Sequence, residues 1–207
     1  MDKSAKFWDK IAQKYAKRPV SNPDAYAEKL AKSREYMTSD SSVLELGCGT
    51  GSTAVAHAPF VKQIHATDIS QGMLEIAKSK LINTEISNIQ FEHASIESLS
   101  FPAGTFDVIM AHSLLHLVED KEQAIGKIHQ WLKPNGMFIS STACIGDFMA
   151  FFKVIAPIGH FLRLIPMVKV FTAQQLKDSV TQIGFDIEHE WKPAKNEALF
   201  LVARKTT

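Results

Sequence analysis

The stretch VLELGCGTGS, residues 43–52, determines the fold that this chain is expected to adopt. A short apolar run contains one acid, Glu45, and glycines follow at alternate positions, Gly47, Gly49 and Gly51. Glycine tolerates left-handed backbone and lets the main chain approach another molecule closely, because it has no Cβ. The stretch therefore predicts a buried strand that ends in a loop built to bind a ligand.

The spacing of these glycines argues against a dinucleotide-binding loop. That loop, G-x-G-x-x-G, has its third small residue five positions after the first, where a helix begins and its N-terminus receives a pyrophosphate. Counted from Gly47, that position is Ser52, and the third glycine, Gly51, comes one residue early. A NAD(P)-dependent oxidoreductase is therefore disfavoured, although it stays an alternative.

The composition is that of an ordinary globular domain. The chain has 207 residues, 45% hydrophobic and 22% charged, so a single domain spanning residues 1–207 is expected. The formal net charge of +1 argues against nucleic acid as a partner, because phosphate binding usually needs a strongly basic face. Two cysteines and an N-terminus without an apolar leader predict a cytoplasmic protein.

Strand-like and helix-like stretches alternate along the chain. Strands are expected at residues 42–46, 63–67, 89–93, 106–111, 136–143, 185–191 and 198–203. Helices are expected at residues 7–15, 24–37, 51–57, 71–81, 120–132 and 173–183. This alternation predicts a doubly wound seven-stranded α/β/α sandwich, and its last two strands, which no helix separates, must form an antiparallel edge hairpin. In such a sheet ligands bind at the carboxyl ends of the strands, where the glycine-rich loop lies.

Five motifs, in order, resemble those of the class I S-adenosylmethionine-dependent methyltransferases that act on small molecules. They are LELGCGTGS, HATDIS, FEHASIESLSF, FDVIMAHSLLHL and LKPNGMFI, and the resemblance extends over roughly residues 7–204. It implies a Rossmann-like fold, S-adenosylmethionine as cofactor, S-adenosylhomocysteine as product and no metal. It also implies methyl transfer by direct displacement to a small acceptor, for which a lipophilic body is one option. A non-catalytic regulatory protein that binds S-adenosylmethionine is the alternative from another functional class.

The resemblance also implies which residues contact the cofactor. The glycines would let the backbone pass close to its amino-acid and ribose portions, with Cys48 as a small residue of the same loop, and Asp68 would accept hydrogen bonds from both ribose hydroxyls. Glu45 would orient the positively charged end or the loop, with a strand-end ion pair as the other interpretation; Asp68 could instead only cap a helix. The full set is Tyr15, Glu45, Gly47, Cys48, Gly49, Gly51, Asp68, Ile69, Met73, Ser95, Ile96 and Ala111.

The adenine ring is expected between apolar side chains. Ile69 and Met73 would sandwich it, although Met73 is equally well explained as ordinary helix core. At the adenine edge the family usually has Asp followed by a small residue, whereas this chain has Ser95 and Ile96. A hydroxyl can still accept from the exocyclic amine, so the departure weakens this contact without removing it.

The acceptor is expected at AHSLLH, residues 111–116, after the fourth strand. This stretch lacks the Asn/Asp-Pro-Pro-aromatic motif of enzymes that methylate nucleic-acid amines, and no acid for a metal occurs between Asp107 and Glu119. His112 and His116 are the candidate catalytic residues, because a histidine there could orient or deprotonate an acceptor. Pocket-wall or packing histidines are the alternative.

Two segments are expected to cover the site. Residues 1–37 would form a helical lid, in which Tyr15 shares a face with Phe7, Trp8 and Ile11. Residues 145–171 would form an apolar insertion that covers the substrate, with packing, homodimer contact or peripheral membrane contact as alternatives, and the protein would be a monomer or a homodimer. This insertion contains no membrane span, because charged, titratable and proline residues interrupt it, namely Lys153, Pro157, His160, Arg163, Pro166 and Lys169. Its basic residues favour an acceptor with an anionic group.

Overall fold

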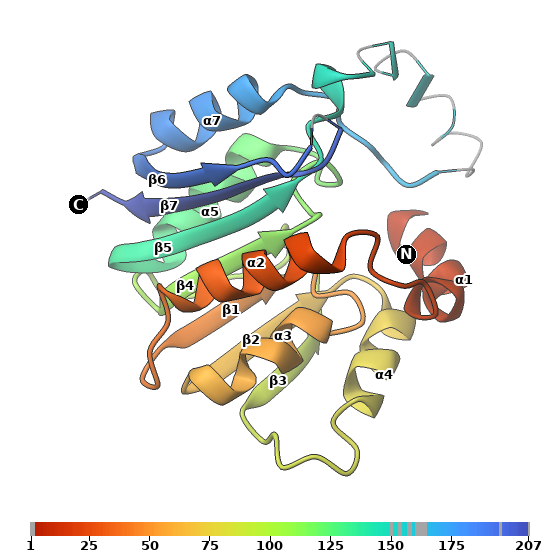
Figure 1. Cartoon of the computed structure of the whole chain (residues 1–207), viewed down its shortest axis with the longest axis vertical. Helices are drawn as coiled ribbons and strands as arrows, with labels where there is room; N and C mark the ends of the chain where they lie inside the picture. The colour runs from red at the N-terminus through yellow and green to blue at the C-terminus, as the bar shows by residue number, and fades with distance from the viewer. Residues whose placement is uncertain are drawn as a thin grey trace.

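The chain forms one seven-stranded sheet in the order β3–β2–β1–β4–β5–β7–β6 (Figure 1). The computed structural model describes residues 3–149, 151–152, 155–156, 159, 165–194 and 196–206. Strands β1 to β5 run parallel, and β7 pairs antiparallel with both β5 and β6. The predicted fold class and the antiparallel edge hairpin are confirmed. The strands are β1 (Ser42–Leu46), β2 (Gln63–Asp68), β3 (Ile89–His93), β4 (Phe106–His112), β5 (Leu132–Thr142), β6 (Phe185–Trp191) and β7 (Leu199–Lys205).

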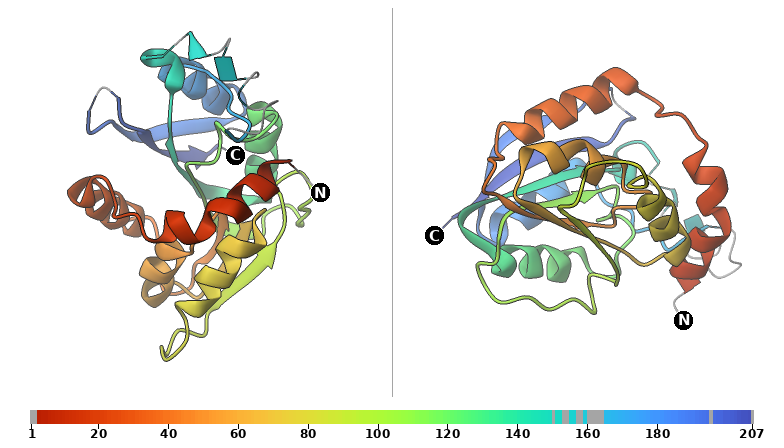
Figure 2. Two further views of the ribbon diagram at one scale, coloured as in Figure 1. Left: turned by 90° about the vertical axis from the view of Figure 1, so that its right-hand side faces the viewer. Right: turned by 90° about the horizontal axis from the view of Figure 1, so that it is seen from below.

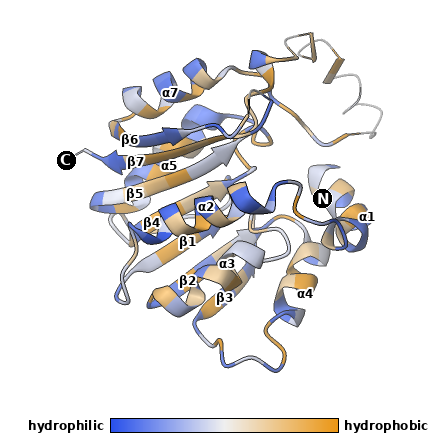
Figure 3. Cartoon of the chain, in the orientation of Figure 1, coloured by the Kyte–Doolittle hydropathy of each residue, from blue (hydrophilic) through white to orange (hydrophobic). Residues whose placement is uncertain are grey.

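Helices cover both faces of the sheet, and Figure 2 shows α5 and α7 on the face opposite α2 and α3. Two buried apolar clusters lie on the two sides of the strands, and Figure 3 shows that the central strands are largely apolar. None of the helices in the described part of the chain is long and apolar enough to cross a membrane. The helices are α1 (Lys3–Ala16), α2 (Pro23–Arg34), α3 (Ser52–His57), α4 (Gln71–Ser79), α5 (Lys121–Trp131) and α7 (Ala173–Gln182), with short 3-10 turns η1 (Ala58–Phe60) and η2 (Ile145–Asp147).

Side-chain caps fix where several helices begin. Ser70 accepts from the amide of Met73 at the start of α4, and Thr172 and Gln175 form a reciprocal capping box at the start of α7. Both starts agree with the sequence. After α5 the sequence predicts a turn at the Lys-Pro-Asn-Gly residues, followed by a strand. In the structure β5 already begins at Leu132, and these residues form a bulge in it before regular pairing with β4 resumes.

The N-terminal helix packs through a face that the sequence does not predict. Its buried residues are Ser4, Ala5 and Ala12, whereas the aromatic residues at the predicted apolar positions are half-buried or exposed. Small side chains let α1 lie close against α4, and a Cβ on Gly72 would come within 3.3 Å of that of Ala12. Asp9 completes this contact by accepting hydrogen bonds from the Ser70 hydroxyl at 2.7 Å and the Gly72 amide at 3.0 Å.

Candidate functional site

A cavity of about 1040 Å³ lies at the carboxyl ends of β1, β2, β4 and β5, bordered by α1 and α2. The order of the sheet switches between β1 and β4, which is where doubly wound folds bind ligands. Ten of the twelve predicted cofactor residues line the cavity: Tyr15, Glu45, Gly47, Cys48, Gly49, Asp68, Ile69, Met73, Ser95 and Ile96. His112 lines it as well.

The three loop glycines serve different purposes, although all have positive φ. A Cβ on Gly49 would meet no heavy atom of the described residues within 4 Å, so its bare backbone faces space that a ligand can use. On Gly51 the same atom would lie 2.8 Å from Cβ of Ala77, so this glycine lets the loop pack on α4 and does not line the cavity. A Cβ on Gly47 would come within 3.0 Å of Leu114.

Asp68 ties the glycine loop to the end of β2. One carboxylate oxygen accepts from the amide of Gly49 and the other from the amide of Ser70, each at 2.8 Å. Each oxygen has a second lone pair, so the carboxylate can still accept from two ligand hydroxyls. Burial raises the pKa of Asp68, and the two amide hydrogen bonds oppose that rise.

Glu45 is a buried acid with an unsatisfied oxygen. The residue is 2% exposed, and its Oε2 has no hydrogen-bond partner among the described residues. Burial and the nearby charge of Asp68 raise the pKa of Glu45 to about 8. Two acids in one cavity favour a cationic ligand, because positive charge stabilises both carboxylates. A sulfonium and an ammonium group fit that requirement.

The other predicted cofactor residues that line the cavity differ in burial and in hydrogen bonding. Met73 is 2% exposed, so it belongs to the core and also contributes a surface to the cavity. The Ser95 hydroxyl already interacts with the amide and hydroxyl of Ser98, at 3.2 and 3.3 Å. Burial raises the pKa of the Cys48 thiol, so this residue stays protonated. Ile69 is half-buried at the cavity edge.

The two candidate histidines lie in different environments. His112 faces the cavity at the end of β4, and burial together with the charges of His57 and Lys29 lowers its pKa to about 3. His116 is not among the cavity-lining residues; burial lowers its pKa to about 4, and its Nδ1 has no partner in the described part of the chain. Ala111 is fully buried and does not line the cavity either.

A strained residue separates the two histidines. Ser113 has a φ of 54°, which a side chain other than glycine rarely adopts. Its amide donates to the carbonyl of Ser141 at 2.7 Å, so the chain turns sharply at the end of β4. Such strain is typical of functional sites. Among the described residues, no group of three His, Cys, Asp or Glu side chains is placed to hold a metal ion.

Sequence reasoning missed several residues that line the cavity. They come from α2 and its N-cap, the end of β5 and the loop between β6 and β7: Asn22, Tyr26, Lys29, Ser141 and Glu197. Lys29 donates to the hydroxyl of Ser141 at 3.0 Å, and Asn22 donates to Glu197 at 3.0 Å. No motif marks them, because they meet only through the way α2 crosses the strand ends.

Part of the apolar insertion also borders the cavity. Pro166 and Met167 line it, and the amide of Lys169 donates to the carbonyl of His116 at 2.8 Å. Several residues on which the predicted cover depends, including Lys153, Pro157, His160 and Arg163, lie outside the described residues.

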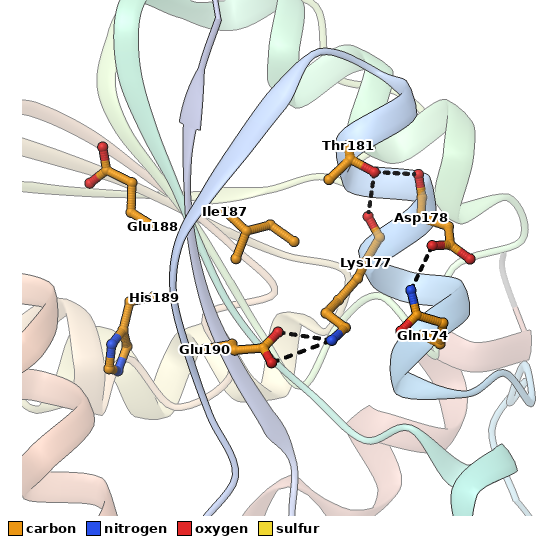
Figure 4. A pocket seen from close by; sticks show the side chains of 8 residues that line it. All are labelled: Gln174, Lys177, Asp178, Thr181, Ile187, Glu188, His189 and Glu190. Carbon is orange, nitrogen blue, oxygen red and sulfur yellow. Dashed lines mark hydrogen bonds and ion pairs between the residues drawn. The ribbon is translucent and has the colours of Figure 1, made fainter.

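A second hollow, of about 410 Å³, lies between α7 and β6. Figure 4 shows that several of its polar groups are already paired: Lys177 forms an ion pair with Glu190, 3.1 Å apart, and Gln174 donates to Asp178, 2.8 Å away. The glycine loop and the strand ends contribute nothing to it. The large cavity is therefore the candidate functional site.

The chain resembles known methyltransferases in sequence and in fold. Residues 44–140 match a family described as a methyltransferase domain. The uncharacterized methyltransferase YcgJ of Bacillus subtilis is 33% identical over 97 residues, 47% of this chain and 38% of that protein. A demethylmenaquinone methyltransferase of Leptospira interrogans is 35% identical over 133 residues, 58% of this chain and 53% of that protein. A malonyl-[acyl-carrier protein] O-methyltransferase of Priestia megaterium is 29% identical over 174 residues, 81% of this chain and 62% of that protein.

The matched stretches span less than two thirds of the length of each of these curated relatives. The crystal structure of YcgJ superposes with a TM-score of 0.72 at 16% identity, covering 87% of this chain and 99% of that one. At that identity the likeness shows a shared fold. The family match over residues 44–140 and the ordered motifs support a class I S-adenosylmethionine-dependent methyltransferase domain in this chain.

Proposed function

We propose that the protein transfers a methyl group from S-adenosylmethionine to a small acceptor inside the large cavity. The observation that carries this proposal is the acid pair beside the glycine loop. Asp68 keeps a free lone pair on each carboxylate oxygen, and Glu45 has an unsatisfied buried oxygen. Together they suit a ligand that has a diol and a positive charge.

In this proposal each part of the cavity binds one part of the cofactor. Asp68 holds the ribose, Ile69 and Met73 contact adenine, and the open backbone at Gly49 accommodates the chain that leads to the amino-acid end. Glu45 balances the positive charge. The cofactor supplies an activated methyl group, so the protein has to align the acceptor and exclude water.

His112 is better placed than His116 to touch an acceptor, because it lines the cavity. With a pKa near 3 it is neutral at physiological pH and a weak base. We therefore propose that His112 orients the acceptor by hydrogen bonding. His116 would then hold the turn below the strand end through packing.

Residues 1–37 would act as a lid and residues 145–171 as a cover. Trp8 and Tyr15 of α1 line the cavity, and their rings meet edge to face at 6.0 Å. Pro166 and Met167 line it from the other segment. Both contacts support a closed site for a small molecule within a single domain.

The names of the relatives bear on the class of acceptor. One relative is named for demethylmenaquinone and another for the malonyl group of an acyl carrier protein. A small-molecule acceptor, or a small group carried on a protein, is therefore our proposal for this chain as well.

Calorimetry with S-adenosylhomocysteine and with NADH tests the proposal. We expect one S-adenosylhomocysteine per chain and no binding of NADH; the reverse result would favour an oxidoreductase. Transfer of a labelled methyl group to a metabolite extract then separates an enzyme from a regulatory binding protein. Binding without transfer to any extract component would leave the regulatory alternative standing and contradict the proposed activity.

A further inference from the structure

The cavity contains a cation, Lys29, that forms no ion pair with any carboxylate of the described residues. Lys29 of α2 is half-buried and lines the cavity. Its ammonium group donates to the hydroxyl of Ser141 at 3.0 Å, and no carboxylate of the described residues lies within the 4.0 Å of an ion pair. An ammonium group has three donors, so two of them remain for a ligand.

The position of Lys29 assigns it to the acceptor. Its hydrogen-bond partner Ser141 pairs directly with His112 across β4 and β5, at the strand ends where the acceptor is expected. The glycine loop follows β1, two strands from β5, which is a separation of roughly 10 Å. Asp68 is one strand further away. Lys29 therefore lies on the acceptor side of the cavity.

Charge is unevenly distributed along the cavity. Both acids, Glu45 and Asp68, lie at the glycine-loop end, where Glu45, with its pKa raised to about 8, is mostly protonated at pH 7 until a cation binds beside it; Lys29 lies beside the neutral His112 at the other end. The charge of Glu197 raises the pKa of Lys29, but burial lowers that pKa more. Its carboxylate also accepts from the amide of Asn22. Within the described part of the chain the partly desolvated ammonium thus has no carboxylate at ion-pair distance, and a ligand can supply that counter-charge.

We propose that the acceptor binds as an anion, with its negatively charged oxygen on the ammonium group of Lys29, beside Ser141 and His112. This inference rests on the proposed function and names the substrate class: a carboxylate, a phenolate or an enolate. It gives Lys29 the role of a specificity-determining residue.

An anionic acceptor makes a general base unnecessary. The nucleophilic atom of the anion forms a bond to the methyl carbon while the bond between that carbon and the sulfonium sulfur breaks. The electron pair of the broken bond stays on sulfur as a thioether. The anion and the sulfonium are both neutralised, no proton has to be removed, and a weakly basic His112 is sufficient.

The test measures the preference for an anion at Lys29. Protein saturated with S-adenosylhomocysteine is titrated with 4-nitrophenolate and with nitrobenzene, a neutral molecule of similar shape, at about pH 8. We expect the wild-type protein to bind the anion at least tenfold more tightly. Lys29→Met should reduce this preference to less than twofold, and Lys29→Arg should retain most of it.

Lys32→Met is the matched control. Lys32 lies on the same helix, pairs with Glu35 at 2.8 Å and is not among the cavity-lining residues, so its loss should leave the preference unchanged. Circular dichroism of all variants checks that they fold. A wild-type protein that shows no preference for the anion, including one that binds neither probe, overturns the inference, as does a Lys29→Met variant that keeps the preference.

A second measurement tests whether Lys29 binds the carboxylate of the cofactor instead of the acceptor. Lys29→Met should change the affinity for S-adenosylhomocysteine by less than threefold. The comparison ligand is 5′-methylthioadenosine, which lacks the amino-acid end. If Lys29→Met loses tenfold or more in affinity for S-adenosylhomocysteine but none for 5′-methylthioadenosine, Lys29 binds the cofactor and the inference is overturned. Failure of the wild-type protein to bind S-adenosylhomocysteine would instead refute the proposed function, while the probe preference, measured without it, would still report on Lys29.

Discussion

Replacing Glu45 by glutamine should stabilise the ligand-free protein, and the gain should grow with pH. In the folded protein the pKa of this buried acid is raised from its ordinary value of 4.5 to about 8. Between these values the folded state binds a proton that the unfolded state has released, so stability falls as pH rises through this window. Glutamine has the same shape and does not titrate there.

The size of the effect follows from the change in pKa. Each pKa unit corresponds to about 1.4 kcal/mol. The raised pKa of Glu45 should therefore lower the free energy of unfolding by roughly 3 kcal/mol at pH 7 and by up to about 5 kcal/mol above pH 8, but by under about 1 kcal/mol at pH 5. These are upper limits, because a buried site relaxes and admits water.

Urea denaturation of wild type and Glu45→Gln at pH 5, 7 and 9, followed by circular dichroism, measures the difference. Comparing the two proteins at each pH removes the contribution of the buried histidines, whose lowered pKa values act in the opposite direction. A difference in unfolding free energy that is constant with pH, or that favours wild type increasingly at high pH, would refute this reasoning. The same acid predicts that S-adenosylmethionine binds wild type more tightly as pH rises through 8, and that Glu45→Gln lacks this dependence.

Three further predictions follow from the geometry. Gly49→Ala should weaken the binding of S-adenosylhomocysteine more than Gly51→Ala does. Gly51→Ala should lower the melting temperature more, because its Cβ would lie 2.8 Å from a neighbouring side chain. Equal effects of the two variants on both quantities would contradict the assignment. Asp9→Ala removes both hydrogen bonds to the start of α4, so limited proteolysis should cleave α1 faster, and an unchanged rate would argue against this contact. His112→Ala should lower the turnover of the true substrate without changing the melting temperature, whereas His116→Ala should lower the melting temperature. Full activity of the His112→Ala variant would contradict the proposed role of His112.

The fold was predictable because its signals are local. Alternating strands and helices, side-chain caps such as Ser70 and Thr172, and a final strand pair without a helix define a doubly wound sheet with an edge hairpin. The bulge at the start of β5 was missed, because it arises from pairing with β4 and has no local signal apart from the turn residues. The packing face of α1 was also missed, because close contact with α4 selects Ala5 and Ala12 over larger apolar residues.

The sequence predicts the residues at the glycine-loop end of the cavity better than those around Lys29. The glycine loop and Asp68 belong to motifs that join a strand to the following turn, so their positions are fixed by adjacent residues. Lys29, Ser141 and Glu197 come from three distant parts of the chain, and their meeting depends on how α2 crosses the sheet. The different positions of His112 and His116 depend on the strained backbone at Ser113, which lies between them.

Titration of wild type and Asp68→Asn with S-adenosylhomocysteine tests the central claim most directly. Asn keeps the shape of the side chain but replaces one acceptor oxygen with an amide group, which can no longer accept from both the loop amide and a ribose hydroxyl. We predict stoichiometric binding to wild type and at least a thirtyfold loss of affinity in Asp68→Asn, with circular dichroism unchanged. Equal affinity of the two proteins, or no binding to wild type, would contradict a cofactor site at the end of β2.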